Sequence, residues 1–207
     1  MTIALPYPIP AQTRMQRLRE ATRHAHTRIE GALPLLDPKL TRARYGVVLE
    51  AFFGFYVGLE PSLLIAAGAH AADIDLGGRA KLPLLLLDLH ALGRTTAELD
   101  ALPRCLELPL TFSSSHALGV LYVLEGATLG GQVIARNLNA ALGLGASNGA
   151  AFFTGYGLET RAMWNRFCEH VECSAALDPD ALVSAAVDTF EKLRIWLVTG
   201  TSHDARR

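Results

Sequence analysis

This sequence has few cysteines and no excess of positive charge. Among its 207 residues there are three cysteines, Cys105, Cys168 and Cys173, and they form neither a CxxC pair nor an even disulfide framework. We therefore expect reduced thiols at buried or half-buried positions. The formal net charge is −1, and no Lys/Arg-rich block occurs along the chain. This balance argues against a nucleic-acid partner, which would be recognised through bulk positive charge.

Motifs of several metalloenzyme classes are also missing. There is no HExxH sequence and no ExxH pair, so a zinc hydrolase and a di-iron helical bundle are both disfavoured. Apart from two histidines near position 25, the chain has five others, which make no recognisable cluster along the sequence: His70, His90, His116, His170 and His203.

Targeting and membrane segments are not expected either. The N-terminus has prolines where a signal peptide would need an apolar core, and its first arginine is Arg14, so it indicates a short disordered lead-in. Residues 117–135 are about as long as a membrane span. However, Glu125 lies in the middle of this segment and four glycines dilute its hydrophobicity. We therefore expect a buried helix of a soluble, cytoplasmic protein.

Helical periodicity dominates the chain, and strand alternation is almost absent. We predict one all-α domain of seven or eight helices over residues 13–199, with a disordered lead-in at 1–12 and a frayed tail at 200–207. The expected helices cover about 13–33, 41–67, 79–92, a brief turn after 95, 113–142, 160–173 and 178–198.

His26 lies in the first predicted helix, within the run ATRHAHTRIE. Glu30 follows it by four residues and shares its helical face, while Arg19 and Arg23 precede it by seven and three residues and fall near that face. A neutral imidazole can bind haem iron while a second group holds its other nitrogen, and guanidinium groups bind carboxylates such as the haem propionates. The alternatives are an ordinary helical histidine and a solvated basic edge.

Three glycines, Gly126, Gly130 and Gly131, interrupt an otherwise apolar predicted helix. Each costs roughly 1 kcal/mol relative to alanine inside a helix, so their presence needs a reason. One explanation is close packing of another helix. The other is a kinked helix whose bare backbone lies over a flat ligand and leaves room for a diatomic molecule. A phosphate-binding loop is disfavoured, because no strand precedes these glycines and no lysine follows them.

These two features occur together in one known family. LREATRHAHTRIE, followed about a hundred residues later by LYVLEGATLGGQVIARNL, resembles the haem oxygenase family, and in particular its bacterial branch that is paired with bacterial phytochromes. The resemblance extends through FFGFYVGLEP, FFTGYG with Trp164, and TFEKLRIWL, and it covers most of the chain. It implies an all-α fold that holds haem between a proximal N-terminal helix and a glycine-kinked distal helix.

The resemblance also implies roles for individual residues. His26 matches the proximal iron ligand, and Arg19 and Arg23 fall where the family places basic residues beside the propionates. Phe190 falls near a position of the last helix that can pack on the haem. The resemblance implies that three glycines form the distal, catalytic side of the haem site: Gly126, Gly130 and Gly131.

One position departs from the family pattern. Mammalian-type members carry an aspartate directly after the first distal glycine, where it organises water near bound oxygen, whereas this chain has Ala127. Bacterial members with an EGS or EGA pattern lack this aspartate as well. A different group must then hold the proton-delivering water.

The activity implied is oxidative cleavage of haem by O2 to biliverdin, CO and Fe2+, with haem as both substrate and cofactor. Electrons would come from an external donor such as a ferredoxin or its reductase, and a bacteriophytochrome would be the acceptor of the bilin. Three alternatives stay open. They are a non-enzymatic haem carrier or sensor on the same fold, a thiaminase-like member of the wider helical superfamily, and a helical interaction module.

Overall fold

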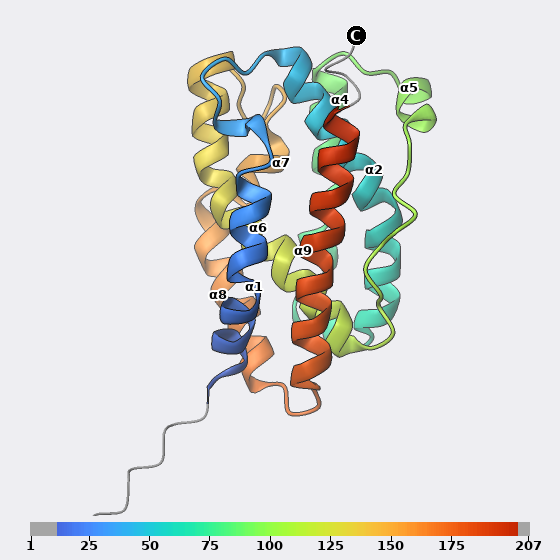
Figure 1. Cartoon of the computed structure of the whole chain (residues 1–207), viewed down its shortest axis with the longest axis vertical. Helices are drawn as coiled ribbons and strands as arrows, with labels where there is room; N and C mark the ends of the chain where they lie inside the picture. Colours follow the sequence, from blue (N-terminus) through green and yellow to red (C-terminus); the bar gives the residue numbers. More distant parts are fainter. Residues whose placement is uncertain (1–11, 203–207) are drawn as a thin grey trace, which may run out of the picture.

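The computed structural model describes residues 12–202, and within that range every regular element is a helix, as the sequence predicts (Figure 1). Nine are α-helices and three are short 3-10 helices. In chain order they are α1 (Arg14–Glu30), η1 (Pro34–Leu36), α2 (Arg42–Ala67), α3 (His70–Asp73), η2 (Gly77–Arg79), α4 (Leu82–Ala91), α5 (Thr96–Ala101), α6 (Ser114–Leu142), α7 (Ala151–Thr154), η3 (Gly157–Glu159), α8 (Thr160–Cys173) and α9 (Pro179–Ser202).

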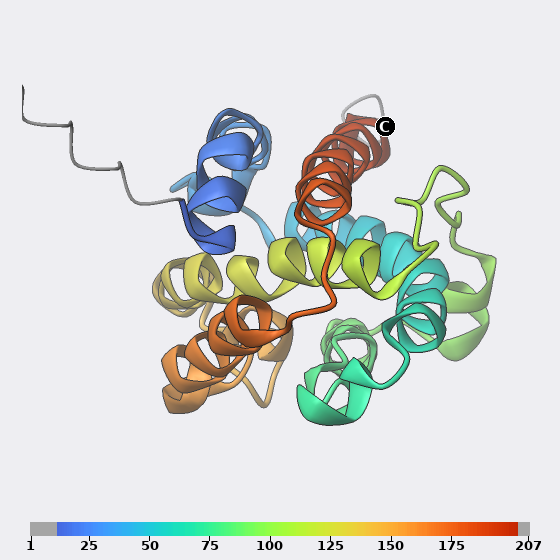
Figure 2. The ribbon, with the colours of Figure 1, turned by 90° about the horizontal axis from the view of Figure 1, so that it is seen from below.

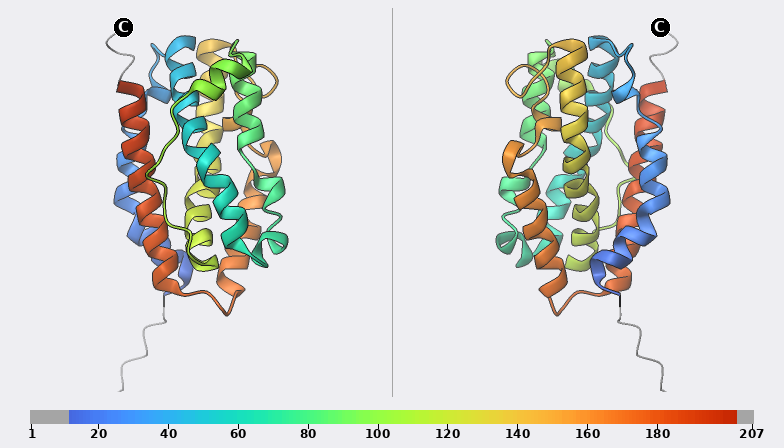
Figure 3. Two further views of the ribbon diagram at one scale, coloured as in Figure 1. Left: turned by 90° about the vertical axis from the view of Figure 1, so that its right-hand side faces the viewer. Right: turned by 90° about the vertical axis from the view of Figure 1, so that its left-hand side faces the viewer.

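The helix α6 lies at the centre of the arrangement. Figure 2 shows α1 and α9 side by side on one side of α6, and α8 with the segment from α3 to α4 on the other side. The packing agrees with this view, because α6 contacts α9, α7, α2 and α8, while α1 packs on α9 and α8. Figure 3 shows α1 and α9 together at one edge of the molecule. One apolar core runs through all of these helices.

Four helices, α1, α2, α5 and α6, begin where the sequence supplies a capping side chain. Thr13 and Thr95 form capping boxes with Gln16 and Glu98, and Thr41 and Ser113 accept hydrogen bonds from backbone N–H groups three residues on. These bonds satisfy N–H groups that have no partner within the helix. At its other end, α6 stops at Gly143, whose φ of 66° is the left-handed conformation that glycine adopts without strain.

The sequence prediction differs from the structure in the stretches that follow α1, α2 and α6. The first helix ends at Glu30 rather than Leu33. Leu33 lies in the connection to η1 and still packs against the core, so its apolar character reflects burial and not helix. The short helices α3 and α7 were not predicted, and α4 begins at Leu82 rather than near Arg79. A single turn such as α3 is too short to show a helical period in the sequence.

The C-terminal helix is longer than expected. It runs to Ser202, so residues 200–202 are helical rather than part of a frayed tail. Leu197 is fully buried, Gly200 lies close to Ala51 of α2, and the Thr201 hydroxyl donates to the Leu197 carbonyl over 2.7 Å. Packing against α2 therefore extends the helix beyond the point where sequence signals end. The remainder of the expected tail, 203–207, and the lead-in up to residue 11 lie outside the described residues.

Two helices, α2 and α6, are long and apolar enough to cross a membrane by length and composition alone. In both, 56% of the most apolar window is buried inside the fold. Core helices of globular proteins have the same character. The packing of α6 by four other helices agrees with the prediction that residues 117–135 form a buried helix.

The three cysteines are unpaired, as expected. Cys105 is buried and Cys168 is half-buried, but Cys173 is exposed, so the expectation of burial was wrong for this residue. The buried face of α8 is formed by Phe167 and Val171. Cys173 follows Val171 by two residues, which turns its side chain about 200° away from that face.

Candidate functional site

His26 lies near the C-terminal end of α1 with its side chain 49% exposed. Its Nδ1 is 3.3 Å from Oε2 of Glu30, one helical turn further along. Its ring meets the ring of Phe190 from α9 edge to face, with 5.7 Å between the ring centroids. Within residues 12–202 its Nε2 has no hydrogen-bond partner. A carboxylate on Nδ1 favours the tautomer whose lone pair is on Nε2, which is the arrangement of a metal-binding imidazole.

Phe190 and His26 are thus brought together, although 164 residue numbers separate them. Phe190 is only 6% exposed and lies in the interface between α1 and α9. Its ring fixes one side of the His26 ring and thereby limits how the imidazole can turn.

Arg19 and Arg23 lie on the same side of α1 as His26, about 20° and 60° from it around the helix axis at 100° per residue. Both are exposed, and both line a shallow hollow together with Gln16 and Glu20. In the part of the chain that the structure describes, neither guanidinium is in a salt bridge with a carboxylate.

Other arginines of the same helix are paired. Arg17 is 2.6 Å from Asp180, and Arg28 is 3.3 Å from Glu191, both on α9. Arg14, the first residue of α1, instead donates to backbone carbonyls of α8. The arginines of α1 therefore join the helix to α9 or α8, except Arg19 and Arg23, which are available to an anionic group.

The surroundings of the three α6 glycines differ. A Cβ at Gly131 would lie 2.8 Å from the carbonyl oxygen of Phe153 in α7, so this glycine permits close packing. A Cβ at Gly126 would make ordinary contact with the Trp164 ring at 3.6 Å. A Cβ at Gly130 would meet nothing within 4 Å among the residues that the structure describes. The packing explanation therefore applies to Gly131, whereas the backbone at Gly130 is open.

The helix α6 bends while remaining helical through these glycines. Figure 2 shows its first half crossing the view and its last part seen almost end-on. Direct contact between α1 and α6 is slight within the described residues, whereas both helices pack on α9 and α8. Ala127 and Gly130 are exposed and three residues apart, so they share one open face of α6.

Glu125, directly before Gly126, faces away from the open face of α6 that Ala127 and Gly130 share, and its side chain is 1% exposed. It forms ion pairs with Arg79 and with Lys81, whose Nζ is 3.2 Å away, and it accepts a hydrogen bond of 2.7 Å from the Tyr156 hydroxyl. About 140° around the helix axis separates it from Gly130. Its carboxylate therefore does not replace the aspartate missing at position 127.

Burial shifts the pKa of several groups in this network. It is the main cause that lowers the pKa of Lys81, and it raises the pKa of the Tyr156 hydroxyl, with the Glu125 carboxylate adding to the rise. Burial also raises the pKa of Glu60, whose carboxylate accepts hydrogen bonds from the backbone N–H groups of Lys81 and Leu82. The network therefore joins the start of α4 to α6 through groups that are largely removed from water.

The sequence contained a signal for this network. A charged residue in the middle of an apolar helix requires a buried partner, because an unpaired charge is costly to remove from water. The partners could not be named, since Arg79 and Tyr156 are 46 and 31 residues away in the chain.

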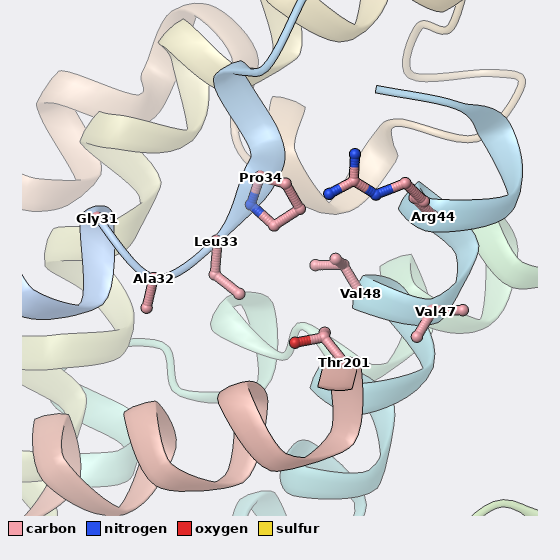
Figure 4. Close-up of a pocket in the computed structure, with 8 residues that line it drawn as sticks. All are labelled: Gly31, Ala32, Leu33, Pro34, Arg44, Val47, Val48 and Thr201. Atoms are coloured by element: carbon pink, nitrogen blue, oxygen red, sulfur yellow. The ribbon is translucent and has the colours of Figure 1, made fainter. Parts of the chain in front are cut away.

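A separate pocket of about 450 Å³ lies between the end of α1, α2 and the end of α9 (Figure 4). Leu33, Val48 and Thr201 line it, together with Arg44, whose guanidinium is 3.3 Å from Asp37. None of the predicted site residues lines this pocket.

A serine-hydrolase pattern also occurs in the chain, as residues 145–149, GASNG. The nucleophile elbow that this pattern marks requires a strand before it and a helix after it. Here α6 precedes the segment, and Ser147 is exposed in the loop that follows Gly143. This segment therefore forms a helix-to-helix turn rather than a catalytic elbow.

The fold and the site define an all-helical, single-domain protein with a half-exposed histidine on its first helix and a bent, glycine-bearing helix at its centre. A family model described as Heme oxygenase matches residues 12–198, and the chain therefore belongs to the haem oxygenase family. It is a haem-degrading oxidoreductase, as the sequence resemblance implies.

Solved structures confirm the fold. Heme oxygenase from Leptospira interrogans superposes with a TM-score of 0.74 at 18% identity, covering 91% of this chain and all of that chain. The NO- and CO-bound heme oxygenase from Neisseria meningitidis gives 0.74 at 21% identity, covering 93% and 94%. Heme oxygenase 2 from Chlamydomonas reinhardtii, solved without heme, gives 0.66 at 21% identity, covering 90% and 96%. No curated protein matches the chain.

Proposed function

We propose that this protein binds haem with Nε2 of His26 as the iron ligand and cleaves it to biliverdin, CO and Fe2+. The observation that carries the proposal is the state of His26. Its Nδ1 faces Glu30, its ring packs on Phe190, and its Nε2 has no protein partner within residues 12–202.

The other residues fit a haem bound there. Arg19 and Arg23 are exposed, lie on the His26 side of α1 and are free of carboxylates in the described part of the chain, so they suit the two propionates. The open face of α6 at Ala127 and Gly130 has only a methyl group and a bare backbone. Such a surface suits the flat face of the macrocycle with a diatomic molecule beside it.

The haem itself supplies O2 binding and is also the group that is oxidised. The contribution of the protein is to position it. His26 orients the iron, Arg19 and Arg23 orient the propionates, and Gly130 leaves room on the oxygen side. Since Ala127 has no polar atom in its side chain, we propose that backbone groups of α6 hold the water that delivers protons.

The finer assignments rest on the sequence resemblance. We propose that electrons come from a ferredoxin or its reductase, and that the bilin passes to a bacteriophytochrome. A soluble, cytoplasmic protein suits both partners. The helix α1, which carries the half-exposed His26, lies at one edge of the molecule, where a bound haem would be accessible to a reductase (Figure 3).

The test is to mix the purified protein with one equivalent of hemin, then add ferredoxin, its reductase, NADPH and O2. We expect the Soret band to fall while biliverdin absorption grows. A stable Soret band under reduction would support the haem carrier or sensor instead. A hemin spectrum unchanged by the protein would contradict haem binding altogether.

The pair Gly130→Ala and Gly131→Ala distinguishes the two roles of the glycines. Gly130→Ala should leave the haem-free protein as stable as wild type, or more stable by up to about 1 kcal/mol, because a Cβ there meets only open space. Its haem oxidation should slow, because the methyl group occupies the oxygen side. Gly131→Ala should lower the free energy of unfolding by about 1–3 kcal/mol, because its Cβ would press on the Phe153 carbonyl.

Urea unfolding of the haem-free variants and single-turnover haem oxidation measure the two effects separately. Equal losses of stability in both variants, or an unchanged oxidation rate in Gly130→Ala, would contradict the assignment.

A further inference from the structure

Two histidines that are far apart in the sequence meet away from the haem site. His70 begins α3 and His170 lies in the last turn of α8, and Nδ1 of His70 is 2.8 Å from Nε2 of His170. Their ring centroids are 5.0 Å apart. The sequence indicated no cluster among its scattered histidines, because 100 residues separate these two.

A third ligand lies beside them. Asp73 is one helical turn after His70 in α3, and a carboxylate oxygen of Asp73 and one nitrogen of each ring all lie within 4.8 Å of one another. His70 and His170 are half-buried, whereas Asp73 is exposed. Two imidazoles and one carboxylate, open to solvent on one side, form the donor set of a three-ligand zinc site whose fourth position is taken by water.

The distances suit a metal ion of this size. Tetrahedral zinc with Zn–N bonds of about 2.0–2.1 Å holds its ligand atoms roughly 3.3 Å apart. The two ring nitrogens are 2.8 Å apart, so they need to separate by about half an ångström to reach this spacing. The carboxylate oxygen lies within 4.8 Å of them, so it needs to approach by at most about 1.5 Å. Rotation of an exposed aspartate side chain provides that movement.

The orientation of the two rings is also favourable. The short N···N contact requires one ring to accept a hydrogen bond, so at least one lone pair already points into the space between the rings.

We propose that His70, Asp73 and His170 form a binding site for a zinc ion, separate from the haem site. Figure 2 shows the segment from α3 to α4 on the opposite side of α6 from α1. The ion would join this segment to α8. The same segment supplies Arg79 and Lys81 to the buried Glu125, so the ion would stabilise the support behind the distal helix.

The test uses haem-free protein stripped of metal with EDTA and dialysed, then titrated with zinc chloride in a calorimeter. We expect wild type to bind one equivalent and its melting temperature to rise with zinc. His70→Ala and His170→Ala should each weaken binding at least tenfold, because loss of a residue that only supports a metal ligand already costs about 10- to 100-fold. His90→Ala is the matched control, since His90 is an exposed helical histidine outside the cluster and should leave the affinity unchanged.

Cobalt chloride provides a second measurement that does not depend on stability. Co2+ bound in a tetrahedral site of wild type should give visible absorption bands that both variants lack. Equal zinc affinity in wild type and the two variants, or no stoichiometric zinc binding by folded wild type, would overturn the proposal. Because no haem is present, this result is independent of whether the protein cleaves haem.

Discussion

His26→Ala is expected to remove the histidine-ligated haem spectrum and to lower the rate of haem oxidation at least 100-fold. In this protein Nε2 of His26 has no partner within residues 12–202, while Nδ1 and the ring are held by Glu30 and Phe190. The imidazole is thus oriented before any ligand arrives, and its loss should exceed the 10- to 100-fold effect that removal of a supporting residue has at metal sites. The measurements are the Soret spectrum of the hemin complex and the single-turnover oxidation rate.

His24→Ala is the matched control for this variant. His24 is exposed on the same helix, but two residues place it about 200° around the axis from His26. Its replacement should leave both the spectrum and the rate unchanged. Imidazole added to His26→Ala should restore part of the spectrum if the pocket is intact. An unaltered Soret band in His26→Ala would refute the assignment of the iron ligand.

Glu125→Ala is expected to have the largest effect on stability, with a loss of about 3–5 kcal/mol in the free energy of unfolding. Its carboxylate is the counter-charge of Arg79 and Lys81, which are 4% and 3% exposed. Without it, two positive charges remain in the core, and the Tyr156 hydroxyl loses its acceptor. Chemical unfolding of the haem-free protein measures the loss.

Glu191→Ala provides the comparison on the surface. Glu191 also binds two cations, Arg28 and Arg194, but its side chain is 38% exposed. Exposed pairs of this kind contribute about 1 kcal/mol or less, so this variant should unfold close to wild type. If Glu125→Ala lost no more stability than Glu191→Ala, the buried network would not be the support of α6 that we describe.

Much of the proximal side of the candidate site could be predicted because it is local in the chain. His26, Glu30, Arg19 and Arg23 lie within one helix, and helical spacing alone places them near one face. The same holds for the starts of α1, α2, α5 and α6, where capping residues act on N–H groups three residues away. The glycines of α6 were recognisable for a similar reason, since their cost within an apolar helix is a local property.

Contacts between helices could not be predicted in this way. The packing of Phe190 on His26, the partners of Glu125, and the meeting of His70 with His170 all join residues that are 31 or more positions apart. Each depends on the angle and depth at which two helices cross. Residue spacing in a single sequence carries no measure of those quantities.

The sequence by itself determined the all-helical class, most helix boundaries and the set of residues that face one side of α1, because backbone hydrogen bonding and side-chain direction repeat every few residues. Only the tertiary structure decided which glycine of α6 is open and which is packed, and which charges are buried. Those properties depend on what neighbouring helices place against a residue. The carbonyl of Phe153 lies against Gly131, whereas no atom of residues 12–202 lies within 4 Å of a Cβ at Gly130.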